Sequence, residues 1–450
     1  MSASPDRSRP PAPGPPRAFA FPDFTRRRLA NGLELWLAPI DRVPLVDIQL
    51  VVDAGSVHDP VASPGLAHFT AAVIDEGTTA RDSREIAAAV ESLGGYLHTG
   101  AGWDTLEISC GVLSRHVETG LELVAEIARR PTFPRPETER LRGQLLAEIE
   151  RRESQPAALA DRHLMAAIYG DTVYGRPRIG TRDSLSALGR DDLAAFHHRY
   201  ASPAGAALLL CGDFDAQVIA ARIDELFGDW EKSEPGERPR PASPEPDGRT
   251  ALLVDRPGAQ TELRLGHPGP PRTHPDFPAA TLLNTLLGGR FMSRINLNLR
   301  ERHGYTYGAS SYFDWRRGPG PFVVTTAVAT EHAAGATGEI LGEIERLRGE
   351  PVEREELEET RNYLIGVFPY STERLSGVSA KLRQMAVHRL PDDYYLDWSE
   401  RLTAVGEDEI QRAARTLLHP ERLVVVAVGP AAELADGFAE LGEVEVLAAG

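Results

Sequence analysis

The spacing of hydrophobic positions changes period along this chain, from strand-like alternation to helical spacing. The run ANGLELWLAP contains an Asn31-Gly32 turn, and the alternating apolar run VDIQLVVDAG follows it. This pattern predicts paired strands. Further strands are predicted at 96–113, helices near 65–75 and 83–93, and two long helices at 114–130 and 134–154. Strands early and helices later are typical of an α+β layered sandwich.

The pattern then repeats. Strands are predicted around ALLVD and TELRLGH, helices from Phe277 and Met292, strands around TYGASSYF and FVVTTAVA, and three long helices after them. Both halves close with helix, proline, apolar strand, glycine and helix, and Pro203 and Gly212 match Pro420 and Gly429 at the same offset. This shared offset predicts an internal duplication of domains of roughly 220 residues.

Two segments are too polar and proline-rich to pack. Residues 1–20 are predicted to be a disordered arm, and residues 229–250, DWEKSEPGERPRPASPEPDGRT, a surface linker. The predicted organisation is therefore an arm at 1–20, one domain at 21–228, the linker at 229–250 and a second domain at 251–450.

Composition narrows the classes of partner. The 450 residues carry a formal net charge of −17, which argues against nucleic acid or an anionic membrane surface as the main partner. An acidic chain suits cationic peptides, although acidity is more commonly a solubility feature. No apolar run approaches the length of a membrane span. The polar N-terminal sequence lacks an apolar signal core, so a cytoplasmic location is expected. Cys110 and Cys211 lie in apolar runs and are interpreted as core residues.

The most informative stretch is residues 63–80, SPGLAHFTAAVIDEGTTA. It resembles the active-site helix of the pitrilysin/insulinase peptidases, the inverted zincins, in Gly65 to Phe69 and in Glu76-Gly77-Thr78. In that family two histidines one helical turn apart bind zinc, and a glutamate between them accepts the proton of the zinc-bound water. A third ligand, a glutamate, comes from a helix further along the chain.

Carried onto this sequence, the resemblance implies a degenerate centre. The first histidine is His68, but Ala71 stands at the glutamate position and Ala72 at the second histidine position, and the late glutamate corresponds to Glu148. Alanine neither binds metal nor moves protons, so no intact catalytic set and no zinc of its own are expected. The plainer interpretations are that His68 is a hydrogen-bonded helix histidine and Glu148 an exposed helix glutamate.

No intact zinc motif occurs elsewhere in the sequence. The adjacent pair His197-His198 makes a poor chelate, because neighbouring side chains on a helix diverge.

The second half contains LLGGRFMSRINLNLRERHGYTYGASSYF, residues 286–313. It resembles the C-terminal signature of the same family, in which an arginine and a tyrosine bind the substrate backbone near the scissile bond and stabilise the oxyanion. By position these are Arg300 and Tyr307, with Tyr305 as the competitor for the tyrosine role. Independently of the resemblance, guanidinium and phenol groups are suitable donors to an oxyanion. The alternatives are a surface ion pair for Arg300 and a half-buried strand aromatic for Tyr307.

One feature departs from the family pattern. The regulatory subunit of the mitochondrial processing peptidase carries a long glycine-rich loop here, whereas Gly288-Gly289-Arg290-Phe291 is short.

The resemblance covers about residues 24–429 and implies a two-half clamshell around a chamber for peptides. It further implies the non-zinc subunit of a heteromeric metallopeptidase, with zinc in a homologous partner subunit to which this chain contributes Arg300 and Tyr307. The alternative is a non-proteolytic structural or peptide-binding protein of the same fold. A free-standing zinc peptidase would need a metal site that the sequence does not contain. Fold alone does not separate the first two.

Overall fold

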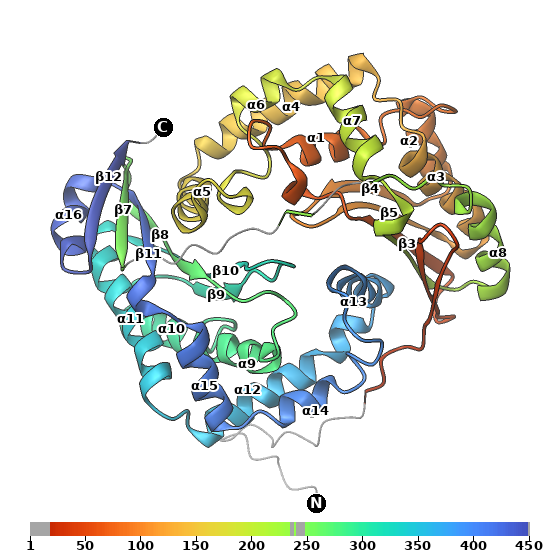
Figure 1. Cartoon of the computed structure of the whole chain (residues 1–450). Helices are drawn as coiled ribbons and strands as arrows, with labels where there is room; N and C mark the ends of the chain where they lie inside the picture. Colours follow the sequence, from red (N-terminus) through yellow and green to blue (C-terminus); the bar gives the residue numbers. More distant parts are fainter. Residues whose placement is uncertain (1–18, 235–237, 240–247, 449–450) are drawn as a thin grey trace, which may run out of the picture.

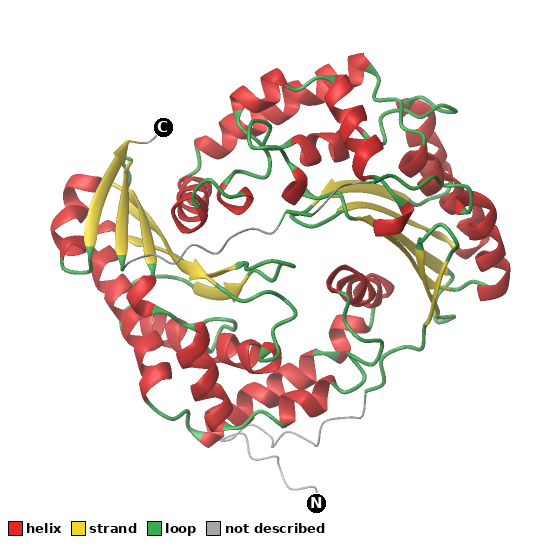
Figure 2. Ribbon diagram, viewed as in Figure 1, coloured by secondary structure: helices red, strands yellow, loops and turns green. Residues whose placement is uncertain are grey.

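The computed structural model describes residues 19–234, 238–239 and 248–448. Two six-stranded sheets, each accompanied by helices, face one another like the shells of a clam (Figures 1 and 2). The predicted α+β class with two sheet-bearing domains is confirmed.

The first sheet has the order β1-β2-β6-β3-β5-β4 and the second the order β12-β7-β11-β8-β10-β9. Their strands are β1 (Thr25–Arg28), β2 (Glu34–Pro39), β3 (Leu45–Val52), β4 (Tyr96–Ala101), β5 (Leu106–Leu113) and β6 (Ala206–Gly212), then β7 (Thr250–Asp255), β8 (Gln260–Pro268), β9 (Ala309–Phe313), β10 (Pro321–Ala329), β11 (Val424–Gly429) and β12 (Glu443–Ala448).

The helices of the two halves follow the same succession. Those of the first half are α1 (Leu66–Val73), α2 (Ser83–Ser92), α3 (Val117–Arg129), α4 (Arg135–Glu153), α5 (Pro156–Tyr169), α6 (Arg182–Ala187), α7 (Arg190–Tyr200) and α8 (Ala216–Phe227). Those of the second are α9 (Phe277–Leu287), α10 (Arg294–Asn296), the π-helical η5 (Leu297–Arg302), α11 (Ala333–Gly349), α12 (Arg354–Val367), α13 (Leu375–His388), α14 (Trp398–Thr403), α15 (Glu407–Leu417) and α16 (Ala431–Ala439).

Short 3₁₀ turns connect these elements. They are η1 (Ser56–His58), η2 (Ser114–His116), η3 (Val173–Gly175), η4 (Pro203–Gly205), η6 (Thr330–His332), η7 (Pro369–Thr372) and η8 (Pro420–Arg422).

The residues that predicted the duplication lie at equivalent places. Pro203 and Pro420 begin the turns η4 and η8, and Gly212 and Gly429 end the strands β6 and β11. A Cβ on Gly212 would lie 2.1 Å from the carbonyl oxygen of Leu45, and one on Gly429 would lie 2.4 Å from Oγ1 of Thr261. A side chain would therefore clash at Gly212 with the backbone of the neighbouring strand, and at Gly429 with the buried side chain of Thr261.

The outer edges of the two sheets differ. β1 lies at the edge of the first sheet, antiparallel to β2, whereas β12 lies at the edge of the second, parallel to β7. The edge strand of the first sheet, β1, comes from the N-terminal end of its half, and that of the second sheet, β12, comes from the C-terminal end of its half.

Each half also lends a helix to the sheet of the other. α5 of the first half packs on β8 and β11, and α13 of the second half packs on β3 and β6 (Figure 1). Buried Leu159, Leu164 and Ile168 of α5 share one hydrophobic cluster with Val254 and Val426 of the second sheet. The packing of the halves is therefore reciprocal, which the linear domain boundaries did not predict.

The described ends of the two polar segments also pack. Phe19, within the predicted arm, makes an edge-to-face contact with Phe368 at 5.3 Å between ring centroids, while residues 1–18 lie outside the described residues. In the predicted linker, Trp230 is buried and Arg238 forms ion pairs with Asp53 and Asp104. Residues 235–237 and 240–247 lie outside the described residues, but the expectation that this linker cannot pack is wrong for Trp230 and Arg238.

Both cysteines are free and buried, on β5 and β6, as expected of core residues. Burial raises the pKa of each thiol to about 12, so both stay protonated. Among the described helices, none has the length and apolarity needed to cross a membrane.

Candidate functional site

The helix α1 carries the degenerate motif, and its start is held by Asp59. The carboxylate oxygens of Asp59 accept hydrogen bonds from the backbone N–H groups of Gly65, at 2.9 Å, and Ala67, at 2.8 Å. Burial raises the pKa of Asp59 to about 7, although both N–H groups act in the opposite direction. Gly65 has φ of 90°, so the sharp entry into α1 suits glycine.

The residues of α1 do not fit a zinc ion. His68 is the one metal-binding side chain among the three motif positions, because Ala71 and Ala72 have no donor atoms. Ala71 is fully buried against the core and Ala72 is partly buried. Nδ1 of His68 is buried and has no hydrogen-bond partner in the described structure. Across the described residues, no group of three His, Cys, Asp or Glu side chains could hold a metal ion.

Glu148 lies on α4, which packs against α1. Its carboxylate accepts hydrogen bonds from Arg151 and Arg152, each at 2.7 Å, and these hydrogen bonds lower its pKa to about 2. Its charge acts on His68 without reaching hydrogen-bond distance. His68 and Glu148, the two implied ligands, therefore lie near each other. The carboxylate of Glu148, however, is already paired with the guanidinium groups of Arg151 and Arg152.

His197 and His198 diverge. Nε2 of His197 lies 2.8 Å from the carbonyl oxygen of Ala128, and the ring contacts Phe133 edge to face, whereas His198 is exposed. The two side chains therefore face different surroundings, as expected for adjacent positions on α7.

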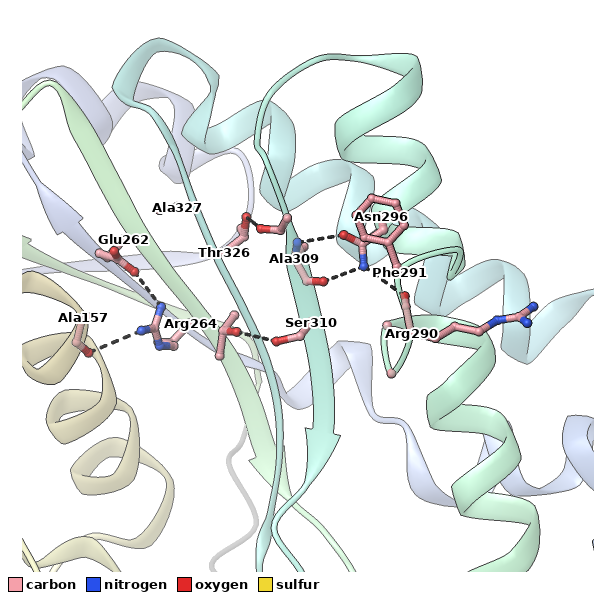
Figure 3. Close-up of a pocket in the computed structure, with 14 residues that line it drawn as sticks. Ala157, Glu262, Arg264, Arg290, Phe291, Asn296, Ala309, Ser310, Thr326 and Ala327 are labelled. Atoms are coloured by element: carbon pink, nitrogen blue, oxygen red, sulfur yellow. Dashed lines mark hydrogen bonds and ion pairs between the residues drawn. The ribbon is translucent and has the colours of Figure 1, made fainter. Parts of the chain in front are cut away.

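The arginine–tyrosine element begins with a helix that ends in π-helical geometry. α10 continues into η5, and Gly304, with φ of 68°, turns the chain after it. Asn296 fixes the returning strand: its side chain donates to the carbonyl oxygen of Ala309 at 2.6 Å and accepts from the backbone N–H of Ala309 at 2.9 Å (Figure 3). Single π-helical turns are frequent at functional sites, and Arg300 lies on this one.

Arg300 is held by two neighbours. Its guanidinium carbon lies 3.4 Å from the ring centroid of Phe291, and Nη2 lies 2.7 Å from the carboxylate of Glu301. Its Nη1 is buried and has no hydrogen-bond partner in the described structure. The side chain is thus largely fixed while one donor remains unused. The ion pair that was the alternative interpretation of Arg300 is thus formed, with Glu301 as its partner.

Tyr307 differs from its expected setting. It lies in the loop two residues before β9, so the prediction of a strand residue is wrong, and it is 97% exposed. Tyr305 is instead stacked between His303, at 4.9 Å, and His332, at 4.6 Å between ring centroids. Of the two tyrosines, Tyr307 is the one free to meet a ligand.

A pocket of about 640 Å³ opens beside this element (Figure 3). Phe291, Asn296, Gly308 and Ser310 line it on one side, and Arg264 on the other. Arg264 pairs with Glu262 at 2.9 Å and with Asp161 of α5 at 2.6 Å. The pocket therefore lies where α5 of the first half meets the second sheet.

The structure does not join the two sets of predicted residues directly. No hydrogen bond or ion pair between described residues links Arg300 or Tyr307 to His68 or Glu148. α5 lies between them, because Ala157 lines the pocket beside the arginine–tyrosine element while Leu159 and Asp161 line a second cavity that contains His68.

Sequence reasoning missed an ionic cluster at the junction of the halves. Asp53 pairs with Arg238 and, at 3.1 Å, with Arg317, while the backbone N–H of Arg317 donates to Asp104 at 3.0 Å. Burial alone would raise the pKa of Asp53, but His58, Arg317 and Arg238 lower it to about 2. Single acidic residues after apolar strands gave no signal that would have identified this cluster.

Comparison with known proteins supplies the family context. The family model described as insulinase (peptidase family M16) matches residues 40–182, and the one described as peptidase M16 inactive domain matches residues 187–364. An uncharacterised zinc protease of Mycobacterium leprae is 30% identical over 64% of this chain and 65% of its own length. One of Rickettsia bellii is 24% identical over 80% of this chain and 86% of its own length.

Solved structures agree. A peptidase M16 inactive domain from Pseudomonas fluorescens superposes with a TM-score of 0.84 and 28% identity, over 91% of this chain and 98% of its own. A protease from Helicobacter pylori shares the fold, with a TM-score of 0.85 at 19% identity over 91% of this chain and all of its own.

Proposed function

Because the chain belongs to the insulinase (M16) family of peptidases, we propose that it is the non-zinc subunit of a heteromeric metallopeptidase that hydrolyses peptides. The observation that carries the proposal is a contrast between the halves. Ala71 and Ala72 leave the first half without a metal-binding set, whereas the second half carries an exposed Tyr307 and an Arg300 whose Nη1 has no hydrogen-bond partner in the described structure.

In this proposal Tyr307 and Arg300 act on a substrate bound at the zinc centre of a homologous partner subunit. A phenol hydroxyl and a fixed guanidinium donate to the carbonyl oxygen of the scissile bond, and these contacts strengthen as negative charge develops there. Phe291 and Glu301 support this role because they hold the Arg300 side chain and reduce the ordering needed on binding. Zinc in the partner would supply the activated water. A cytoplasmic location is part of the proposal.

The test is reconstitution. The full chain, a homologous subunit with an intact zinc motif from the same genome, and their mixture are assayed on a quenched fluorescent peptide. We expect hydrolysis by the mixture and at most a small fraction of that rate from either subunit alone. Hydrolysis by this chain alone after dialysis against a chelator would refute the proposal. A stable complex whose activity equals that of the zinc subunit alone would favour the structural or peptide-binding alternative.

A further inference from the structure

A second cavity, of about 540 Å³, occupies the place of the degenerate zinc centre. Its walls come from α1, α4, α5 and the segment 175–181. Trp103, Leu159 and Met165 give it an apolar side. The volume lies within the range of sites for small organic ligands, which combine apolar walls with a few polar groups.

The polar groups of this cavity are mostly cationic. Arg152, Arg162, Arg176 and Arg178 line it, although the whole chain carries a net charge of −17. Arg178 donates to the carbonyl oxygen of Ala101 at 2.9 Å. Arg176 donates to the carbonyl oxygen of Pro60 at 2.8 Å. Neither forms an ion pair with a carboxylate of the described residues, so their charges are not matched at close range.

The nearby carboxylates are already engaged. Glu148 is shared by Arg151 and Arg152, Glu153 lies 3.5 Å from Arg162, and Asp161 pairs with Arg264 outside the cavity.

Longer-range charges distinguish the remaining arginines. Asp59 and Asp171 act on Arg176, while Arg178 is acted on by Arg152 and Arg316 as well as by Asp314 and Glu107. Arg178 is therefore the cavity arginine with the least compensation, because Arg152 already shares Glu148 with Arg151.

The pKa of His68 is also affected by these positive charges. Burial, and after it the charges of Arg178 and Arg152, lower its pKa to about 4, while the charge of Glu148 acts in the opposite direction. The imidazole is neutral at neutral pH, and its buried Nδ1 has no hydrogen-bond partner in the described structure. The cavity thus presents a neutral hydrogen-bonding ring beside the unpaired guanidinium group of Arg178.

We propose that this cavity binds a carboxylate attached to an apolar group, and specifically the free C-terminal carboxylate of a peptide with an apolar last side chain. Arg178 would contact the carboxylate, because a guanidinium fork matches its two oxygens. Trp103 and Leu159 would contact the apolar side chain. The inference concerns binding by this chain alone, so it stands or falls separately from the proposed role of Arg300 and Tyr307.

The test is calorimetric titration of the full chain, without a partner, with acetyl-Ala-Ala-Leu as the free acid and as the C-terminal amide. The free acid should bind, and amidation should weaken binding at least tenfold. Arg178→Gln should weaken binding of the free acid by about tenfold, since it removes a charge-assisted hydrogen bond. Arg178→Lys should restore part of it.

Arg354→Gln is the matched control, because Arg354 is an exposed helix arginine paired with Glu358, remote from the cavity, and it should leave binding unchanged. Equal binding of acid and amide, no detectable binding of the acid, or unchanged binding by a folded Arg178→Gln variant would overturn the proposal. Octanoate binding as tightly as the peptide would overturn the assignment to peptides and indicate a fatty acid site.

Discussion

The two halves of this molecule share a fold and differ in chemistry. Each has a six-stranded sheet in which five strands follow the same order, and β6 and β11 both end in a glycine. In the first half, the position of the metal centre holds Ala71, Ala72 and an arginine-lined cavity. In the second, η5 and its loop carry a fixed arginine and an exposed tyrosine.

The difference shows that a duplicated fold preserves its packing more strictly than its site. The exchange of α5 and α13 ties each half to the sheet of the other, so neither half can lose its core without affecting its neighbour. Of the first site, His68 lines a cavity, whereas Ala71 belongs to the core, where its small side chain is accommodated by the packing.

The largest effect is expected in the second half. In the reconstituted pair, Arg300→Ala or Tyr307→Phe should lower kcat by roughly 10²–10³, since each removes a donor to a developing oxyanion. Folding should be retained because Tyr307 is 97% exposed. Steady-state kinetics separates this role from simple substrate binding, which would raise KM and leave kcat nearly unchanged. Tyr305→Phe is the control, because its ring stacks between two histidines. Wild-type kinetics in both variants would contradict the assignment.

The junction between the halves should respond in stability. Asp53→Asn leaves Arg238 and Arg317 without their shared carboxylate, and the loss of one partner from a largely buried cluster should lower the free energy of unfolding by about 3 kcal/mol. The pKa of Asp53 is about 2 when folded, so its contribution is complete above about pH 4 and is lost as the pH falls towards 2.

Asp392→Asn is the matched control for that experiment. Asp392 also bridges the halves, through Arg26 at 3.1 Å, but its side chain is 59% exposed, so less than about 1 kcal/mol is expected. Thermal or urea unfolding measures both. Equal losses in the two variants would show that the cluster around Asp53 has no special role.

Zinc binding should distinguish a decayed site from a cryptic one. The purified chain should retain less than about a tenth of an equivalent of zinc after dialysis, because His68 has no second strong ligand on α1. Restoring the motif with Ala71→Glu would place a carboxylate at a fully buried position, so Ala72→His is the better single change.

Glu148 should limit that restored site. Removing its competitors, in Ala72→His with Arg151→Ala and Arg152→Ala, should tighten zinc binding by about tenfold over Ala72→His alone, a size typical of groups that orient metal ligands. Calorimetry with zinc gives both affinities. Identical affinities would show that Glu148 does not reach the metal.

The smallest effect concerns acid stability. The pKa of His68 is lowered from its ordinary value to about 4 in the folded chain. As the pH falls, this histidine therefore becomes protonated in the unfolded chain before it does in the folded chain. His68 therefore lowers stability progressively as the pH falls from about 6.5 to 4. His68→Gln should flatten the dependence of the unfolding midpoint on pH in this interval. His388→Gln is the comparison in the second half, where burial lowers the pKa to about 3. A slope unchanged in His68→Gln would show that His68 is not held neutral.

The sequence by itself determined the fold class, the duplication and the family. Periodic apolar positions specify strands and helices locally, and Pro203, Gly212 and their counterparts recur at a shared offset that is visible without coordinates. The loss of metal-binding side chains at Ala71 and Ala72 is equally local, because alanine has no donor in any fold.

Only the tertiary structure decided which groups meet. Arg178 and Arg152 lie beside His68 because α4 and the segment 175–181 enclose the same cavity, and Arg238 pairs with Asp53 across 185 residues of sequence. Tyr307 lies before its strand because Asn296 anchors the strand at Ala309. Such contacts depend on packing between distant segments, and no spacing along the chain encodes them.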